Sequence, residues 1–216
     1  MNGKGETAMN VTYLSVGNMG ANCYFVSDDK GNAVIIDPGA DSERILKTVK
    51  ENNFTVFFVL LTHAHFDHIM AAEAVCTALG APLCVGAADA SMLGNDRLNL
   101  SSMVYPNKPV SLTADRQLRE GDVIAFGDAE LTVWETPGHT PGCVCFFGKG
   151  VLFTGDTLFA GSIGRTDLPG GDMSALRRSL ARLAALDVDY TVYSGHGEET
   201  KLSCEKAANP YLAHIV

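Results

Sequence analysis

Four side chains of the kinds that bind metal ions lie within six consecutive residues of this chain. Residues 62–68 read THAHFDH and follow an apolar run. If this segment leaves a strand in extended form, His63, His65 and Asp67 alternate onto one side, and His68 begins the following helix. Imidazole and carboxylate groups suit Zn²⁺, Mn²⁺ and iron. The spacing therefore predicts a site for two adjacent metal ions.

Three further residues of the same kinds follow predicted strands later in the chain. His139 lies in the sequence PGHTPG, Asp156 in TGDT and His196 in SGHG. Glycine next to such a residue lets the backbone approach closely, as a crowded metal site requires. Strand ends are also where a rigid scaffold places reactive side chains. Five of the six histidines thus fall at predicted strand ends, and only His214 has no predicted role.

A protein nucleophile is the competing interpretation of the chemistry. The chain has no GxSxG nucleophile elbow, and Cys143 and Cys145 alternate within an apolar run, which favours packing roles. The six cysteines form no CxxC pair. We expect reduced core thiols rather than disulfides.

Composition excludes several classes of protein. The chain has 216 residues, is 46% hydrophobic and carries a formal net charge of −9, which disfavours nucleic acid and anionic lipid as partners. Residues 1–10 form a polar tail without a secretory signal, and no apolar run approaches the roughly 20 residues that span a bilayer. We expect a cytoplasmic protein that does not bind membranes.

Two successive β-rich blocks, each ending in strand–loop–helix units, are expected to position these residues. This order favours two packed sheets with helices outside, an α/β sandwich of four layers. Residues 95–115 are the least patterned and are interpreted as an insertion or a lid. Val56–Leu61 is expected to be buried on both faces, and Asp41 or Ser42 to cap a helix. The predicted strands cover residues 11–16, 22–26, 33–37, 56–61, 82–85, 123–126, 130–135, 143–147, 151–154 and 190–193. The predicted helices cover residues 42–50, 68–79, 87–94 and 198–208. A further helix is predicted after Asp172, which would cap it, with Met173 and Leu176 facing inward.

The motifs HxHxDH, GHT, GD and GHG, in this order, resemble those of the metallo-β-lactamase superfamily, over residues 11–212. Residues 161–167 (GSIGRTD) and the ending GHG…NPYL resemble its glyoxalase II-like, or hydroxyacylglutathione hydrolase-like, branch. The resemblance implies a four-layer αββα sandwich, with a single domain over residues 11–216.

The resemblance also implies the ligands of two divalent metal ions, zinc first, with iron or manganese as alternatives. It assigns His63, His65 and His139 to the first ion, Asp67, His68 and His196 to the second, and Asp156 to a bridge between them.

The reaction implied is hydrolysis of a thioester, such as an S-2-hydroxyacyl-glutathione, by a metal-bridging hydroxide. Asp67 and Asp156 would be the catalytic carboxylates, and Arg165 and Tyr193 are candidate substrate contacts. A structural pair of Arg165 with Asp167, and a strand tyrosine packed in the core, are the alternative interpretations. Full glyoxalase II enzymes add a C-terminal helical domain for which this chain has no room, so we expect no strict dependence on glutathione.

Two other activities remain open within the same fold. An iron-dependent persulfide dioxygenase draws its ligands from the same motif and also carries a GRTD segment. Another hydrolase of small esters or lactones is the second alternative. Each takes a small molecule as its partner.

Overall fold

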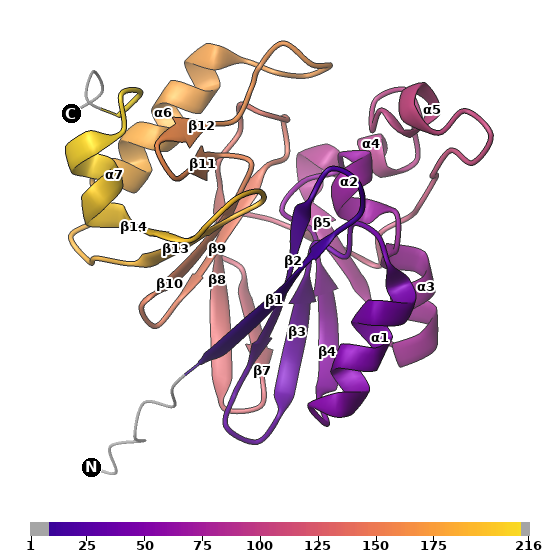
Figure 1. Ribbon diagram of the computed structural model, residues 1–216. Coiled ribbons are helices and arrows are strands. Elements are labelled where there is room, and N and C mark those ends of the chain that lie inside the picture. The colour runs from indigo at the N-terminus through magenta and orange to yellow at the C-terminus, as the bar shows by residue number, and fades with distance from the viewer. Residues whose placement is uncertain (1–8, 213–216) are drawn as a thin grey trace.

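The computed structural model describes residues 9–212 and contains two six-stranded sheets and a separate two-stranded sheet (Figure 1). The greater part of the expected tail 1–10, and His214, lie outside the described residues.

The first sheet is formed by the N-terminal half of the chain. Its first three strands pair antiparallel, and the pairs from the third strand to the sixth are parallel. Its strands follow the chain in the order β1 (Asn10–Val16), β2 (Ala21–Ser27), β3 (Asn32–Ile36), β4 (Thr55–Leu60), β5 (Leu83–Gly86) and β6 (Arg116–Leu118). The connecting helices are α1 (Ser42–Glu51), α2 (Phe66–Ile69), α3 (Ala72–Leu79), the 3₁₀ turn η1 (Ala87–Asp89), α4 (Ala90–Leu93) and α5 (Ser101–Val104).

The second sheet is formed by the C-terminal half. Within the described residues, β10 and β13 pair parallel, and the other neighbouring strands of this sheet pair antiparallel. Across the sheet the order is β14 (Thr200–Lys201), β13 (Thr191–Ser194), β10 (Val151–Gly155), β9 (Val144–Gly148), β8 (Ala129–Glu135) and β7 (Val123–Phe126). The remaining elements are the hairpin β11 (Leu158–Phe159) and β12 (Ser162–Ile163), and the helices α6 (Met173–Ala184) and α7 (Leu202–Ala208).

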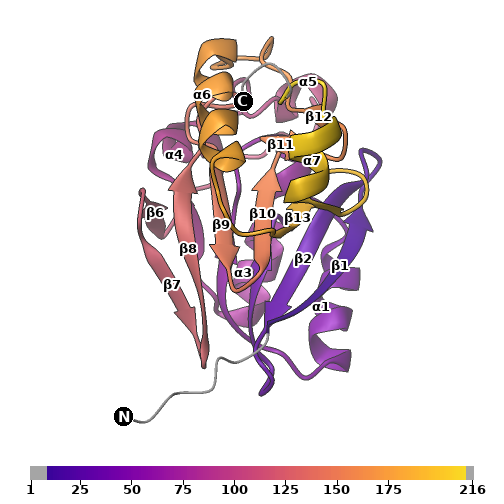
Figure 2. The ribbon, with the colours of Figure 1, turned by 90° about the vertical axis from the view of Figure 1, so that its left-hand side faces the viewer.

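Three hydrophobic clusters separate four layers, so the expected αββα sandwich is confirmed. Alternate residues of one strand enter different clusters, because successive side chains point to opposite faces of a sheet. In β3, Ile35 packs beneath α1 and α3, whereas Ile36 faces the second sheet. In β10, Phe153 faces the first sheet and Leu152 packs beneath α6. Figures 1 and 2 show α1 and α3 outside the first sheet and α6 and α7 outside the second.

The prediction that Val56–Leu61 is buried on both faces is wrong for its first half. Phe57 is 38% exposed, and only the end of β4, at Val59 and Leu60, is fully covered. The cause is a β-bulge, since Ala33 pairs with Val56 and the next residue of β3 pairs with Phe58. Phe57 is the extra residue, which a period-two pattern does not reveal.

Two predicted helices also require correction. The helix expected over residues 68–79 is two helices, α2 and α3, and His68 lies inside α2 rather than at its start. The last helix begins at Leu202 instead of residue 198, because Thr200 and Lys201 pair with β13 as a short strand. Strands of two or three residues, such as β6, β11, β12 and β14, are too short for alternation to show.

Residues 95–115 contain α5 and are held against the rest of the fold by Asn99. Its side-chain amide donates to the carbonyl oxygens of Leu93 and Val110, at 3.4 and 2.9 Å. The backbone carbonyl oxygen of Asn99 accepts the N–H of Phe66, the first residue of α2. This segment is therefore joined to the helix that carries Asp67 and His68. Among residues 9–212, no helix combines the length and apolar character needed to cross a bilayer.

The helix cap expected at Asp172 is confirmed, and it gives a first prediction. The Asp172 carboxylate accepts the N–H groups of Ser174 and Ala175 at 2.7 and 3.0 Å, whereas Met173, expected to face inward, is 40% exposed. Asp172→Ala is expected to lower the free energy of unfolding by about 1 kcal/mol in urea titrations. Ser174→Ala, which keeps its backbone N–H, is the control, and equal stabilities of the two variants would contradict this role. Asp41, by contrast, makes no side-chain cap at α1.

Candidate metal centre

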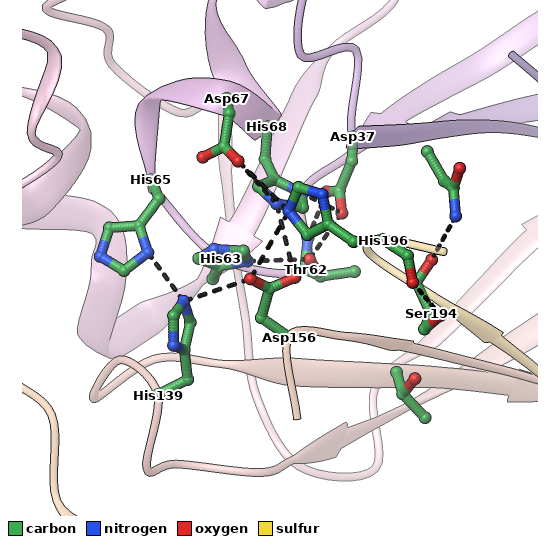
Figure 3. A network of polar contacts seen from close by, with 12 residues as sticks. Asp37, Thr62, His63, His65, Asp67, His68, His139, Asp156, Ser194 and His196 are labelled. Atoms are coloured by element: carbon green, nitrogen blue, oxygen red, sulfur yellow. Dashed lines mark hydrogen bonds and ion pairs between the residues drawn. The ribbon is translucent and has the colours of Figure 1, made fainter. Parts of the chain in front are cut away.

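Loops at one end of both sheets bring all seven predicted ligand residues together (Figure 3). His63 and His65 lie in the loop after β4, and α2 carries Asp67 and His68. The second sheet contributes a residue between β8 and β9, one directly after β10 and one after β13, namely His139, Asp156 and His196. Residues from both halves of the chain thus meet where the two sheets face each other.

The ligand atoms fall into three groups whose members lie within 4.8 Å of one another. The first and the last of these groups contain the residues that the family resemblance assigns to the two ions. The groups are His63, His65 and His139; His63, His68 and Asp156; and Asp67, His68 and His196.

The carboxylate of Asp156 reaches both of the outer groups. Its Oδ2 atom lies 3.5 Å from His139 Nε2 and 3.8 Å from His196 Nε2. Its Oδ1 atom lies 3.5 Å from His68 Nε2. A carboxylate in this position can serve as a ligand to two ions at once.

Unpaired polar atoms show that these residues fit a metal centre. Among the described residues, the buried side-chain atoms without a hydrogen-bond partner are His63 Nε2, His65 Nε2, His68 Nε2 and Asp156 Oδ1. A buried polar atom left unsatisfied costs about 1–3 kcal/mol. All four belong to the cluster, and nitrogen and carboxylate oxygen are donors that zinc and iron accept.

Asp37 orients two of the imidazoles, and the sequence analysis did not identify it. Its carboxylate accepts the N–H and O–H of Thr62, at 2.7 and 2.6 Å, and Nδ1–H of His68, at 2.9 Å. Because the Thr62 hydroxyl proton goes to Asp37, the hydroxyl oxygen accepts from His63 Nδ1, at 3.1 Å. Both rings therefore carry a proton on Nδ1 and present Nε2 to the cluster.

A backbone carbonyl orients His139 in the same way. His139 Nδ1 donates to the carbonyl oxygen of Arg165 over 2.7 Å, which leaves Nε2 for the cluster. Two glycines make room for this packing. A Cβ at Gly164 would lie 1.8 Å from the Asp156 carbonyl oxygen, and a Cβ at Gly195 would lie 2.1 Å from Asp156 Oδ1.

Asn22 and Tyr24 hold the loop that carries His196. The Asn22 amide donates to the carbonyl oxygens of Ser194 and Gly197, each at 3.0 Å. The Tyr24 hydroxyl donates to Ser194 O at 2.6 Å. Both residues belong to β2 of the first sheet, so this contact fixes the His196 loop across the sheet interface.

The pKa values within the cluster separate into two sets. Burial and neighbouring imidazoles lower the pKa of His63, and they lower that of His65 to about 3. For His68, burial acts in the same direction, but the carboxylates of Asp67, Asp156 and Asp37 outweigh it and raise the pKa to about 10. A metal ion bound at His68 must displace this proton, since a ligating nitrogen is unprotonated.

Asp67 and His196 stabilise each other's charged forms. The distance from His196 Nε2 to Asp67 Oδ2 is 3.2 Å. Burial opposes ionisation of Asp67, but His68 and the contact with His196 overcome it and lower its pKa. Burial also opposes the charge on His196, and Asp67 raises the pKa of that imidazole nevertheless.

The candidate substrate residues occupy different surroundings. Arg165 is an exposed residue whose Nε and Nη2 donate to the two carboxylate oxygens of Asp167, each at 2.7 Å. The ring of Tyr193 stacks on Phe153 at 5.2 Å and meets Tyr24 edge-on at 5.5 Å. The Arg–Asp pair is therefore present in the structure, and Tyr193 is a partly buried ring that packs against the core between the sheets.

Cys143 and Cys145, the thiols nearest the GHT motif, do not form a competing nucleophilic site. All six cysteines are free thiols, as expected. Burial raises the pKa of Cys143, and it raises that of Cys145 to about 11. Because the thiolate is the reactive form, neither thiol is activated.

Metal loading is expected to stabilise the fold, because the cluster is formed only in the folded chain. An ion at about 100 times its Kd should raise the free energy of unfolding by about 2.7 kcal/mol. Thermal unfolding of chelator-treated protein, before and after Zn²⁺ is added, measures this. Equal melting temperatures for the two samples would contradict the assignment.

The chain is similar to known proteins over most of its length. The profile of the family described as "Metallo-beta-lactamase superfamily" matches residues 16–196. The chain is 34% identical over 209 residues to hydroxyacylglutathione hydrolase GloC of Haemophilus influenzae, covering 94% of this chain and 98% of that protein.

Two solved structures share the whole fold. The B3 metallo-beta-lactamase BLEG-1 superposes with a TM-score of 0.89 at 36% identity, covering 94% of this chain and 99% of that one. TTHA1623, solved in a di-iron-bound form, superposes with a TM-score of 0.82 at 35% identity, covering 93% and 100%.

Proposed function

The chain belongs to the metallo-β-lactamase superfamily, and from this premise we propose that it is a hydrolase that uses two metal ions to cleave a thioester of the S-2-hydroxyacyl-glutathione kind. The observation that carries the proposal is the position of Asp156 between the two histidine-containing groups. The similarity to GloC over nearly the full length of both chains supports the choice of substrate class.

We assign the ligands as the resemblance implies. The first ion takes His63, His65 and His139, the second takes Asp67, His68 and His196, and Asp156 is shared. Each set draws on both sheets, which supports a single catalytic domain over residues 11–216. Zinc is the proposed metal, and the di-iron form of TTHA1623 supports iron as the alternative.

The burial of the cluster sets the side from which a substrate approaches. The side chains of His63 and His68 are fully buried, whereas His196 is 27% exposed and Asp67 14% exposed. Two divalent ions held here would polarise a carbonyl oxygen and supply a water whose pKa falls to roughly 7. Asp67 lies on the exposed side of the cluster and could accept a hydrogen bond from the attacking water. Asp156 would hold the two ligand groups at a fixed separation.

Residues outside the cluster are proposed to bind the rest of the substrate. The exposed guanidinium of Arg165 is a candidate to bind a substrate carboxylate. Arg165 lies next to the cluster, because its backbone carbonyl oxygen accepts a hydrogen bond from His139. Tyr193 is the second candidate, at the end of β13. We propose a small-molecule thioester as the only class of partner, and a cytoplasmic location in keeping with six unpaired thiols.

The proposal is tested by thiol release. Purified protein loaded with zinc, or with iron, is mixed with a series of acyl-thioesters and a thiol-reactive dye, and its metal content is determined by elemental analysis. Dye reaction that requires bound metal supports the hydrolase. Iron-dependent consumption of O₂ with a persulfide, without thiol release from any thioester, would instead support the dioxygenase.

A further inference from the structure

Asp89 is a buried carboxylate that neither the sequence analysis nor the proposed reaction uses. It ends the 3₁₀ turn η1, just after β5, and has no exposed surface. Its Oδ2 atom accepts the N–H of Ala64 at 3.0 Å and the hydroxyl of Thr140 at 2.7 Å. Its Oδ1 atom accepts the N–H of Gly142 at 2.7 Å. All three of these partners donate hydrogen bonds, so the residue at this position must be one that only accepts hydrogen bonds.

These three hydrogen bonds join the two loops that carry the first group of imidazoles. Ala64 lies between His63 and His65, and Thr140 directly follows His139. One loop extends from the first sheet and the other from the second, so Asp89 fixes their separation. The loops meet closely here, because a Cβ at Gly142 would lie 2.2 Å from the backbone nitrogen of Asp89.

We propose that Asp89 is a positioning residue that sets the spacing of His63, His65 and His139, and thereby the affinity of this group for its ion. The inference rests on the proposed two-ion function. A metal site needs its ligands held to within about 0.5 Å of the productive geometry. Loss of a group that orients ligands typically costs about ten- to a hundred-fold in metal affinity.

Asp89→Asn separates this role from simple burial of a polar group. The amide nitrogen must replace either Oδ1, where it would face the Gly142 N–H, or Oδ2, where it would face the Ala64 N–H. Either orientation sets one donor against another and loosens one of the two loops. We expect one of the two ions to bind about ten- to a hundred-fold more weakly, and the other to bind as in the wild type.

The chain offers a matched control and a milder variant. Asp28 is also a buried carboxylate. It accepts the N–H groups of Lys30 and Asn32 in the β2–β3 turn and of Asp128 in the β7–β8 turn, and none of these partners belongs to a ligand loop. Asp28→Asn should therefore leave both ion affinities unchanged. Thr140→Val removes one donor and keeps the carboxylate, so we expect a smaller loss for the same ion.

The experiment is a competition titration of the metal-free, full-length variants with Zn²⁺ and a chromophoric chelator, together with the visible absorption spectrum of the Co²⁺-loaded proteins. Selective weakening of one ion, with a changed cobalt spectrum in Asp89→Asn and a smaller change in Thr140→Val, is the expected result. Unchanged affinities in the folded variants, or equal weakening of both ions, would overturn the inference. If Asp89→Asn does not fold, Thr140→Val decides by the same criteria. Wild-type protein that binds fewer than two ions would contradict the proposed function itself, and with it this inference.

Discussion

Asp156→Asn is expected to lower kcat/KM for thioester hydrolysis by about a thousand-fold or more, equivalent to roughly 4 kcal/mol of transition-state stabilisation. The reason is its position, since its two carboxylate oxygens reach His68, His139 and His196. The amide nitrogen cannot bind a metal ion, and the remaining amide oxygen lacks the negative charge that attracts both ions. The substitution should therefore weaken both ion sites, whereas loss of any single imidazole removes a ligand from one.

Steady-state kinetics and elemental analysis of the same preparation measure this effect. Asp189→Asn is a matched control, because that exposed carboxylate accepts the N–H of Ser203 at 2.9 Å, away from the ligand loops. The control should retain wild-type kinetics and metal content. An Asp156→Asn protein with two tightly bound ions and near-normal activity would show that Asp156 is not shared between them.

His65→Ala is expected to reduce activity by at least about a hundred-fold. Loss of a residue that only orients a ligand costs up to about a hundred-fold, and His65 is proposed to be a ligand itself. The fold should persist, because His65 Nε2 has no hydrogen-bond partner among the described residues and His65 Nδ1 contacts His139 Nε2, at 2.8 Å, within the same cluster. The bound metal should fall from two ions towards one.

Circular dichroism and urea unfolding of the metal-free protein check that His65→Ala remains folded, and the thiol-release assay measures its activity. Activity that survives this substitution in a folded protein would refute the assignment of His65 to the first ion.

The sequence predicted the candidate metal ligands more completely than the residues that orient them. Imidazoles and carboxylates can be recognised in the sequence as possible metal ligands by their residue type. Four of them also lie close together along the chain, namely His63, His65, Asp67 and His68. Asp89 and Asn22 carry no such signal, because their roles depend on loops that are distant in sequence and meet only in the folded chain. Asp37 could have been found, since it ends the predicted strand 33–37, and Asp156 lies just beyond its own predicted strand 151–154.

The errors in the fold prediction have similar physical origins. Hydrophobic periodicity predicted the mixture of strands and helices, whereas the αββα layers were inferred from the order of these elements and from the family resemblance. The bulge at Phe57 and the break between α2 and α3 are set by pairing and packing with other elements. The first N–H of α2, that of Phe66, donates to the backbone carbonyl oxygen of Asn99 in the poorly patterned segment 95–115. Local sequence does not contain that information.

The most direct measurement of the central claim is an anomalous diffraction map of crystals of the metal-loaded protein, recorded at the absorption edge of the bound metal. We predict two peaks on either side of the Asp156 carboxylate, one among His63, His65 and His139 and the other among Asp67, His68 and His196. A single peak, or peaks outside this cluster, would contradict a centre in which two ions share Asp156.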